Sequence, residues 1–311
     1  MNVKPYSLGH LAAFATIMIW GTTFISTKIL LRDFTPVEIL FSRFVIGYIA
    51  LLMFYPKKLK INKFSQEWLF IAAGISGITL YYLLENIALT FTTASNVGII
   101  ITVAPLFTAL LACWLLKTEK PTLQFYIGFL AAITGITLIS YNGDRSQHFN
   151  LIGDILALLA AATWAIYSIL IKKIGEFNYN TIQATRRTFF YGLLFMFPVL
   201  LFTGFSPDIE KFTAPVNLGN ILFLGLGASA LCFVSWNMAV KLLGAIKTSV
   251  YIYLVPVVTV ATSVIILNEP LTPTLITGAL LTLTGLWLSE TKIFDGRKTI
   301  AKQEDCIQHN D

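Results

Sequence analysis

The sequence contains one unit written twice, and this duplication most limits what the chain can fold into. Residues of uncommon type recur at a constant offset of 151 positions: Gly74/Gly225, Asn86/Asn237, Ala94/Ala245, Pro105/Pro256 and Thr108/Thr259. After a one-residue deletion the offset becomes 150, as in Glu119/Glu269, Gly128/Gly278 and Gly135/Gly285. An offset of 144 extends the repeat to Gly9/Gly153, Trp20/Trp164 and Arg43/Arg187. Chance supplies Leu and Ala matches in an apolar chain, but ordered matches of Pro, Asn, Glu and paired Gly indicate a duplication.

The composition places both copies in a membrane. The chain of 311 residues is 56% hydrophobic and 12% charged, and its mean hydropathy is +0.74. A soluble domain carries about 25% charged residues, so too few polar residues are present to cover a water-facing surface. The three cysteines, Cys113, Cys232 and Cys306, form no disulfide or metal-binding pattern.

Ten apolar runs are long enough to cross a bilayer, which needs about 20 mostly apolar residues per helix. Their approximate limits are 8–31, 36–55, 67–89, 94–116, 122–141, 151–174, 181–203, 217–240, 245–267 and 272–290. The sequence therefore predicts an all-α membrane protein of ten transmembrane helices. We expect a first five-helix repeat at 8–141, a second at 151–290 and a polar cytoplasmic tail at 291–311.

The odd number of spans in each repeat has a topological consequence. An odd number of crossings leaves the chain on the side of the membrane opposite to where it began. The second repeat therefore starts from that side and has the inverted orientation relative to the first. Inverted repeats that meet at the bilayer midplane are typical of secondary transporters, which alternate between two mirror-related arrangements. This topology favours transport over any other function.

Basic residues are distributed unevenly between the two sides. With the N-terminus inside, fifteen Lys and Arg residues fall in inner segments and only four in outer segments. This asymmetry follows the positive-inside rule and predicts that both termini are cytoplasmic. The net charge of +6 therefore reflects orientation, and no nucleic-acid partner is expected.

Two symmetric pairs within the spans are candidates for function. Pro105 and Pro256 lie near the middle of spans 4 and 9, where a proline removes a backbone hydrogen bond. Each is interpreted as a hinge beside a central cavity or as a static kink. Trp20 and Trp164 are also mid-span, away from the interfaces that Trp prefers. They line a wet cavity or serve as packing aromatics.

Spans 3 and 8 carry polar residues at equivalent positions: Glu85 and Asn86 in one, Trp236 and Asn237 in the other. Helical spacing places Tyr82 with the first pair and Phe233 with the second, and these faces should point inward. Glu85 could bind a substrate amine or exchange a proton. The alternative, which we favour slightly, is a structural ion pair with Arg43.

Further polar residues in the spans have weaker signals. Arg187 mirrors Arg43, and a position at a helix end outweighs anion binding for it. Asn96 and Tyr251 add polar edges to spans 4 and 9. The paired glycines of spans 5 and 10, such as Gly128 and Gly278, allow close helix packing or a dimer contact.

Enzymatic functions are not supported. The three histidines are scattered, so they could not ligate a metal together. The sequence has no nucleophile elbow, phosphate-binding loop or dinucleotide fingerprint. Neither a cofactor nor catalytic residues are expected, and uphill transport would draw on a gradient, for which proton coupling is a candidate.

The motifs resemble those of the drug/metabolite transporter superfamily, in the ten-span group with two EamA domains. They are Ile19-Trp20-Gly21-Thr22-Thr23-Phe24, Asn86-Ile87-Ala88-Leu89 and Asn237-Met238-Ala239, with Pro36, Arg43 and the repeated Ala, Pro, Glu and Gly positions given above. The resemblance covers residues 8–290. It implies a basket in which spans 1, 3, 4, 6, 8 and 9 enclose a cavity, with spans 5 and 10 outside.

The resemblance also implies which positions of this sequence bind substrate. The candidates are Trp20, Tyr82, Glu85, Asn86, Asn96, Trp164, Tyr167, Phe233, Trp236, Asn237 and Tyr251. The resemblance further implies export of amino acids, other metabolites or drugs across the bacterial cytoplasmic membrane by a monomer or homodimer. An amino acid with an apolar or aromatic side chain is our first hypothesis. A carrier of larger or anionic, nucleotide-like metabolites and a non-transporting scaffold or sensor are the alternatives.

Overall fold

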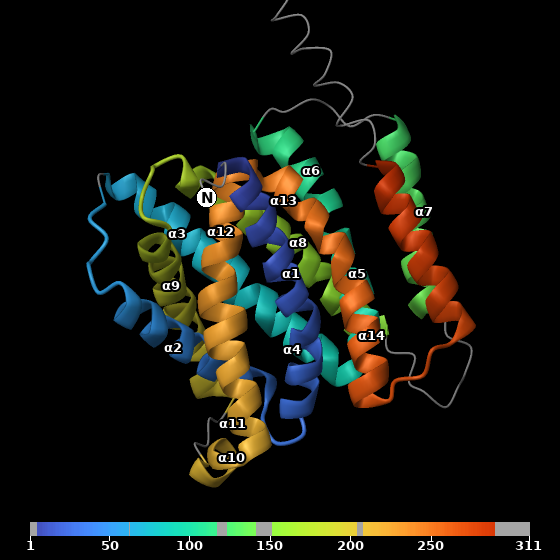
Figure 1. Cartoon of the computed structure of the whole chain (residues 1–311), viewed down its shortest axis with the longest axis horizontal. Coiled ribbons are helices and arrows are strands. Elements are labelled where there is room, and N and C mark those ends of the chain that lie inside the picture. The colour runs from blue at the N-terminus through green and yellow to red at the C-terminus, as the bar shows by residue number, and fades with distance from the viewer. Residues whose placement is uncertain (1–4, 62, 117–122, 141–150, 204–207, 290–311) are drawn as a thin grey trace, which may run out of the picture.

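The computed structural model describes residues 5–61, 63–116, 123–140, 151–203 and 208–289, and every element in these ranges is helical (Figure 1). Eight segments are long and apolar enough to cross a membrane: Tyr6–Leu30, Pro36–Phe54, Phe64–Phe91, Ala94–Leu115, Leu151–Gly175, Thr181–Phe202, Pro215–Leu243 and Ala245–Leu267. Two shorter apolar helices, Leu123–Ile139 and Pro273–Ser289, occupy the remaining predicted spans. The predicted tail at 291–311 and Glu119 lie outside the described residues.

Spans 1, 2, 6 and 7 are single helices, whereas spans 3, 4, 8 and 9 are each divided. The single helices are α1 (Pro5–Leu30), α2 (Pro36–Phe54), α8 (Leu151–Gly175) and α9 (Thr181–Phe202). The divided spans of the first repeat are η1 (Phe64–Gln66), α3 (Glu67–Gly74), η2 (Ile75–Leu80) and α4 (Tyr81–Phe91), then α5 (Ala94–Ile100), η3 (Ile101–Val103) and α6 (Ala104–Leu116). Those of the second are α11 (Pro215–Leu222), η4 (Phe223–Leu231) and α12 (Cys232–Leu243), then α13 (Ala245–Ser249), η5 (Val250–Leu254) and α14 (Val255–Leu267). Helix α7 (Leu123–Ser140), the short α10 (Ile209–Thr213) and the last helix (Pro273–Ser289) complete the fold.

The irregular segments fall at equivalent positions of the two repeats. Segments η2 and η4 are π-helical, and η3 and η5 are 3-10 helical. Pro105 and Pro256 follow the 3-10 segments as the second residues of α6 and α14. In the first turn of an α-helix the missing N–H of proline has no intrahelical acceptor to lose. Each proline therefore lies just after a change of helix type within its span.

The contacts at the two ends of the bundle show that the repeats are inverted. Gly9, near the start of α1, lies against Leu243 at the end of α12, where a Cβ on the glycine would be 2.8 Å from Leu243 Cγ. Gly153, near the start of α8, lies in the same way against Phe91 at the end of α4 and Thr92 just after it. Figure 1 shows the start of α1 at one end, called here the terminal end, and α10 at the opposite end. The predicted fold class is thereby confirmed.

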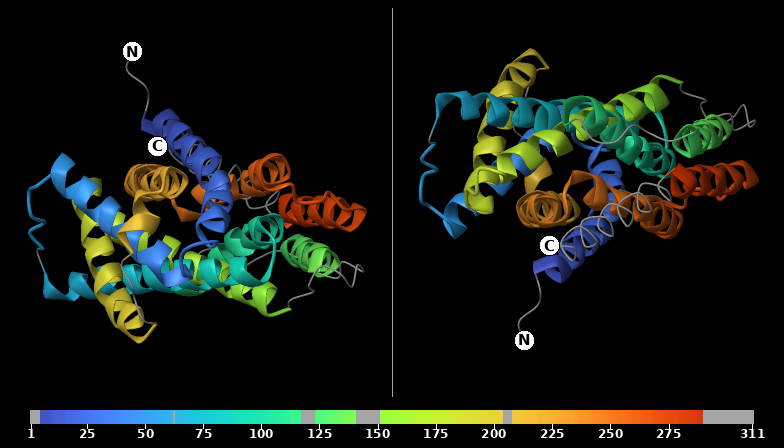
Figure 2. Two further views of the ribbon diagram at one scale, coloured as in Figure 1. Left: turned by 90° about the horizontal axis from the view of Figure 1, so that it is seen from below. Right: turned by 90° about the horizontal axis from the view of Figure 1, so that it is seen from above.

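Helix α7 and the last helix pack together at one edge of the molecule, as the two views of Figure 2 show. A Cβ on Gly285 would lie 2.6 Å from the backbone oxygen of Gly128, and one on Gly135 would lie 2.6 Å from that of Gly278. Thr282 Oγ1 donates to the Ala132 carbonyl at 3.4 Å. The four glycines therefore serve contact between two helices of the same chain.

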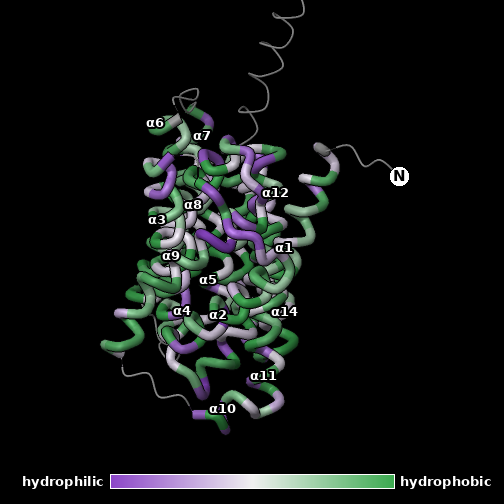
Figure 3. The backbone as a smooth tube through the Cα atoms, turned by 90° about the vertical axis from the view of Figure 1, so that its left-hand side faces the viewer, coloured by the Kyte–Doolittle hydropathy of each residue, from purple (hydrophilic) through white to green (hydrophobic). Residues whose placement is uncertain are grey.

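The surface agrees with a lipid environment. Large apolar side chains such as Met53, Phe54, Trp114 and Phe202 are exposed, and hydrophobic residues run along most of the bundle (Figure 3). In a bilayer such residues meet lipid tails, while backbone polar groups are satisfied within helices. The chain is a multi-pass membrane protein.

We expect Gly285→Ala to lower the thermal stability of the detergent-purified protein. The added methyl group overlaps backbone atoms of α7, and overpacking of this kind costs about 1–3 kcal/mol. Gly219→Ala is the matched control, because nothing lies within 4 Å of a Cβ there and Ala favours a helix over Gly. Equal melting temperatures for the two variants would contradict the tight contact.

Candidate functional site

A small enclosed cavity lies between the two repeats. It is lined by Ile17, Trp20, Thr23, Phe24, Tyr81, Tyr82, Glu85, Ile101, Trp164, Ile252 and Val255, which we call the central cavity. These residues come from α1, α4 and η3 of the first repeat and from α8, η5 and α14 of the second. The volume is about 30 Å³, the scale of a single water molecule. A larger ligand therefore enters only when the walls move apart.

Aromatic rings form one side of the central cavity. The Trp20 and Trp164 rings meet edge to face with centroids 5.1 Å apart, and Tyr81 lies 4.9 Å from Trp164. Trp20 Nε1 donates to the Ala228 carbonyl at 2.9 Å. Ala228 belongs to the π-helical η4, a segment type whose altered hydrogen bonding is frequent at functional sites. The packing thus fixes the orientation of Trp20 within the wall.

Glu85 is the charged residue that lines the central cavity. Its side chain is 1% exposed, and its Oε1 atom has no hydrogen-bond partner. The neighbouring Tyr81 side chain interacts with the same carboxylate. Burial of a carboxylate without full pairing is costly, so this arrangement points to a functional role.

The expected ion pair between Glu85 and Arg43 is not formed. Among the described residues, the ion pair within 4.0 Å joins Arg187 to Glu67 instead. Arg43 is fully buried, donates from Nε to Ser229 Oγ at 3.0 Å, and places its Cζ 4.3 Å from the Tyr82 ring centroid. Ser229 on η4 and the ring of Tyr82 thus hold the guanidinium, whose Nη1 and Nη2 have no partner. Arg43 is also absent from the cavity lining.

Three of the predicted residues form a second layer behind the cavity walls. Phe233 and Trp236 lie 5.5 Å and 5.1 Å from Trp20 by ring centroids. Tyr167 lies 5.0 Å from Trp164 and donates its hydroxyl to Asn237 Oδ1 at 2.9 Å. These contacts position the lining rings.

Four other predicted residues lie away from the central cavity. Asn86 donates to the Pro36 carbonyl at 3.0 Å, and Asn237 donates to Thr185 Oγ1 at 2.9 Å. Asn96 donates to Thr92 Oγ1 at 3.1 Å near the start of α5. Tyr251 meets His10 Nδ1 at 2.6 Å near the start of α1. Asn86, Asn237 and Tyr251 thus join separate elements, Asn96 makes a local contact at the start of its own helix, and none of the four lines the cavity.

Seven lining residues were not among the predicted site residues: Tyr81, Thr23, Phe24 and the apolar Ile17, Ile101, Ile252 and Val255. Tyr81 lies four residues before Glu85, which places both on one helical face, so this spacing was an available signal. The apolar residues carried none, because the spans are rich in Ile and Val throughout.

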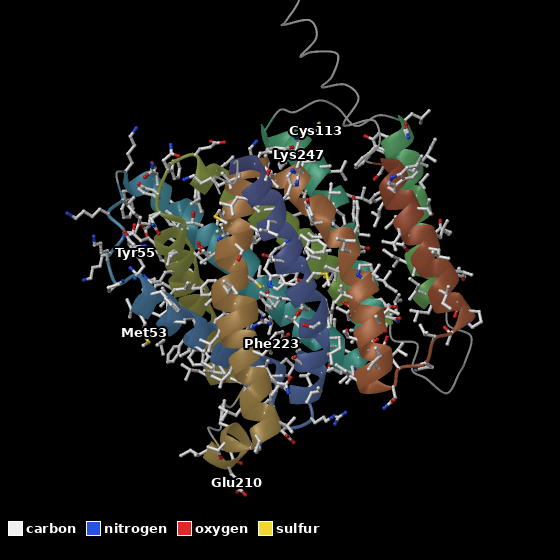
Figure 4. All side chains as sticks on the ribbon, viewed as in Figure 1. Met53, Tyr55, Cys113, Glu210, Phe223 and Lys247 are labelled. Atoms are coloured by element: carbon white, nitrogen blue, oxygen red, sulfur yellow. The ribbon has the colours of Figure 1, made fainter. Side chains whose placement is uncertain are left out.

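Arg186 and Arg187, near the start of α9, both have partners within the protein. Arg187 Nε donates to Glu67 Oε1 at 2.8 Å, and the Tyr191 hydroxyl donates to the same oxygen. Arg186 donates to the carbonyls of Tyr55 and Lys57 after the end of α2; Figure 4 labels Tyr55 at that edge. Both arginines fasten α9 to the α2–α3 connection, so the charge of Arg187 is matched within the protein.

A larger pocket of about 520 Å³, which we call the vestibule, opens at the end of the bundle opposite to the terminal end. It is lined by Lys28, Leu31, Arg32, Leu89, Thr90, Thr93, Leu267, Asn268, Glu269 and Pro270. Glu269 accepts from the backbone N–H groups of Ala94 and Ser95 at 2.8 Å and 3.1 Å, which caps α5 from the other repeat. A carboxylate at a helix N-terminus is stabilising. This contact closes the repeats against each other beneath the vestibule.

We expect Glu269→Ala to destabilise the protein. The change leaves the α5 N–H groups and Ser95 Oγ, which donates to Glu269 at 2.6 Å, without their charged acceptor, at a cost of about 1.5–3 kcal/mol. Thermal melting of the purified protein measures this loss. Glu210→Ala is the control, because Glu210 is an exposed carboxylate on α10 (Figure 4). If both variants melt like the wild type, Glu269 does not hold the repeats together.

Comparison with known proteins agrees with this architecture. The EamA-like transporter family matches the chain twice, over residues 7–141 and 151–291. An uncharacterized transporter of Archaeoglobus fulgidus is 29% identical over 299 residues, covering 94% of this chain and 99% of the relative. A probable terminal-alkyne amino-acid exporter of Streptantibioticus cattleyicolor is 25% identical, covering 91% and 93%.

A solved structure titled "Crystal structure of protein" superposes with a TM-score of 0.66 at 18% identity. The superposition covers 90% of this chain and 96% of the other, so the two proteins share their fold. The family matches together cover nearly all of the sequence. The chain belongs to the EamA-like transporter family, within the drug/metabolite transporter superfamily, and is a membrane transporter built from two EamA domains.

Proposed function

We propose that the protein is a secondary transporter that exports small organic metabolites, with amino acids as the first candidates, by alternating access. The observation that carries the proposal is the central cavity, whose lining comes from both inverted repeats. Contacts between the repeats close the bundle at both ends of this cavity. Inverted repeats around a midplane site are the architecture through which such carriers alternate.

We infer the orientation of the protein in the membrane from the distribution of its basic residues. The start of α1 and Lys247 lie at the same, terminal end (Figure 4), where the predicted inner segments are rich in Lys. We assign this end to the cytoplasm of a bacterium and the vestibule to the outside, in accord with the positive-inside rule. The vestibule is then the exit route.

Two features support motion around the central cavity. Pro105 and Pro256 lie at the junctions of 3-10 and α-helix. Pro105 lies four residues after the lining residue Ile101, and Pro256 directly follows the lining residue Val255. Short 3-10 stretches within helices are frequent at hinges, so we assign a hinge role to both prolines.

Because the sequence has no ATP-binding loop, we assign the driving force to a proton gradient.

Amino acids come first among the substrates for two reasons. The relative from Streptantibioticus cattleyicolor is named as a probable amino-acid exporter, and the cavity combines a carboxylate with aromatic and apolar walls. An anion carrier is the second candidate, supported by the two unpartnered guanidinium nitrogens of Arg43. It ranks second because Arg43 does not line the cavity.

The test is counterflow in proteoliposomes. Vesicles loaded with unlabelled leucine or phenylalanine are diluted into the same labelled amino acid, and we expect label to accumulate inside only where the protein is present. A pH gradient should drive uphill movement, and a protonophore should abolish that movement while counterflow continues.

Protein-free liposomes and Glu210→Ala are the controls. Accumulation of labelled nucleotides or organic anions, with none of amino acids, would establish the second candidate. Absence of flux for every compound class would favour a membrane scaffold or sensor.

A further inference from the structure

The central cavity offers one anionic acceptor and one neutral donor to a ligand. Glu85 Oε1 and Trp164 Nε1 are both buried without a hydrogen-bond partner, and both residues line the cavity. Two other donors of the lining already have backbone acceptors. Trp20 Nε1 donates to the Ala228 carbonyl, and Thr23 Oγ1 donates to the Trp20 carbonyl. A buried polar atom without a partner is costly, so these two atoms call for a ligand.

The two repeats treat their equivalent tryptophans differently. Trp20 of the first repeat donates to Ala228 on η4. The equivalent carbonyl for Trp164 belongs to Gly77 on η2, but the ring of Tyr167 packs there, where a Cβ on Gly77 would lie 2.1 Å from Tyr167 Cδ2. Trp164 Nε1 is consequently left without the backbone acceptor that symmetry provides to Trp20.

We propose that the central cavity recognises a primary ammonium group, with the Glu85 carboxylate as its counter-ion. The rings of Trp20, Tyr81 and Tyr82 form the walls around this group, and the N–H of Trp164 donates to an oxygen of the same ligand. An α-amino acid or another amine with a neighbouring oxygen has this chemistry. The inference rests on the proposed function, since it assigns a substrate class to the transport cavity.

Charge and shape both favour an ammonium group over an anion. Glu85 is the charged residue among those that line the cavity, and the faces of aromatic rings attract cations. The space of about 30 Å³ is on the scale of one water molecule, and a –NH₃⁺ group is of similar size. Arg43 interacts electrostatically with Glu85, but its side chain is directed to Ser229 and Tyr82 and it does not line the cavity.

The apolar lining residues of the cavity suit a hydrocarbon side chain of the ligand. They include Ile17, Ile101, Ile252 and Val255, which come from three different spans. Ile101 and Ile252 belong to the two 3-10 segments, which precede the prolines. When these segments move, the space next to the ammonium site widens along the apolar wall. The ligand class is therefore an amine with a hydrocarbon side chain.

Equilibrium binding to the detergent-purified protein tests this assignment, with tryptophan fluorescence and calorimetry as readouts. The probes form two series: phenylalanine, 2-phenylethylamine and 3-phenylpropanoate, then leucine, 3-methylbutylamine and 4-methylpentanoate. We expect the amino acid and the amine to bind in at least one series and the acid to bind at least tenfold more weakly. Equal or tighter binding of the acids, or no binding of either amine, overturns the proposal.

Variants separate the two polar contacts. Glu85→Gln should weaken amine binding at least tenfold, while Glu38→Gln, which alters a buried carboxylate that caps α2, should leave it unchanged. Trp164→Phe keeps a ring but removes the N–H, so it should weaken amino-acid binding about threefold to tenfold and leave the amine unaffected. Equal losses for both ligands in Trp164→Phe would contradict the donor role.

Binding and flux distinguish this proposal from the proposed function. If amines bind through Glu85 but no labelled amino acid exchanges in counterflow, the transport proposal fails and the recognition site stands. If amino acids exchange but Glu85→Gln binds them like the wild type, transport stands and ammonium recognition by Glu85 fails. Gel filtration of each variant establishes that it is folded, and the amine–acid comparison on the wild type needs no variant.

Discussion

The absence of water in the bilayer core governs this structure, because every backbone polar group there needs a partner within the protein. Regular helices satisfy the requirement alone, whereas π and 3-10 segments leave groups to be paired elsewhere. Such segments occur here where the spans of the two repeats meet. Ala228 of η4 receives the Trp20 indole N–H, and Ser229 receives Arg43. The π-helical segment η4 thus provides one backbone and one side-chain acceptor, Ala228 O and Ser229 Oγ, to buried donors of the other repeat.

Duplication supplies equivalent positions in the two repeats, but the side chains at these positions differ in identity or in hydrogen bonding around the cavity. Trp20 is paired and Trp164 is not, while Glu85 has Trp236 as its counterpart at the 151-residue offset. One repeat therefore contributes the charge and the other contributes a free donor and aromatic bulk. Inversion preserves the helix arrangement that alternating access needs, whereas divergence of single side chains makes the cavity asymmetric, as the proposed recognition of an ammonium group and an oxygen of one ligand requires.

The fold was predictable from the sequence, whereas the site was predictable only in part. Span number, duplication and inversion follow from hydropathy and repeated Pro, Asn and Gly, which are long-range patterns. Tyr82, Glu85 and Asn86 share one face of the regular helix α4, yet Tyr82 and Glu85 line the cavity while Asn86 donates to the Pro36 carbonyl at the start of α2. The difference comes from the packing of α2 against α4, which the periodicity within span 3 does not reveal. Arg43 needed a partner as expected, but Ser229 lies 186 positions away in sequence, beyond any local pattern.

The contracted cavity separates two aspects of recognition. Its aromatic lining is already positioned, because Trp20, Trp164 and Tyr81 pack ring against ring and Trp20 donates to the Ala228 carbonyl. Two of its apolar residues, Ile101 and Ile252, lie on η3 and η5, the segments for which we propose movement. A preorganised charged group recognises the head of a ligand at little cost in ordering, whereas a movable wall accepts side chains of different size. Under the proposed function, a cavity of this kind discriminates strictly by head group and loosely by side chain, which fits the proposed export of several related metabolites.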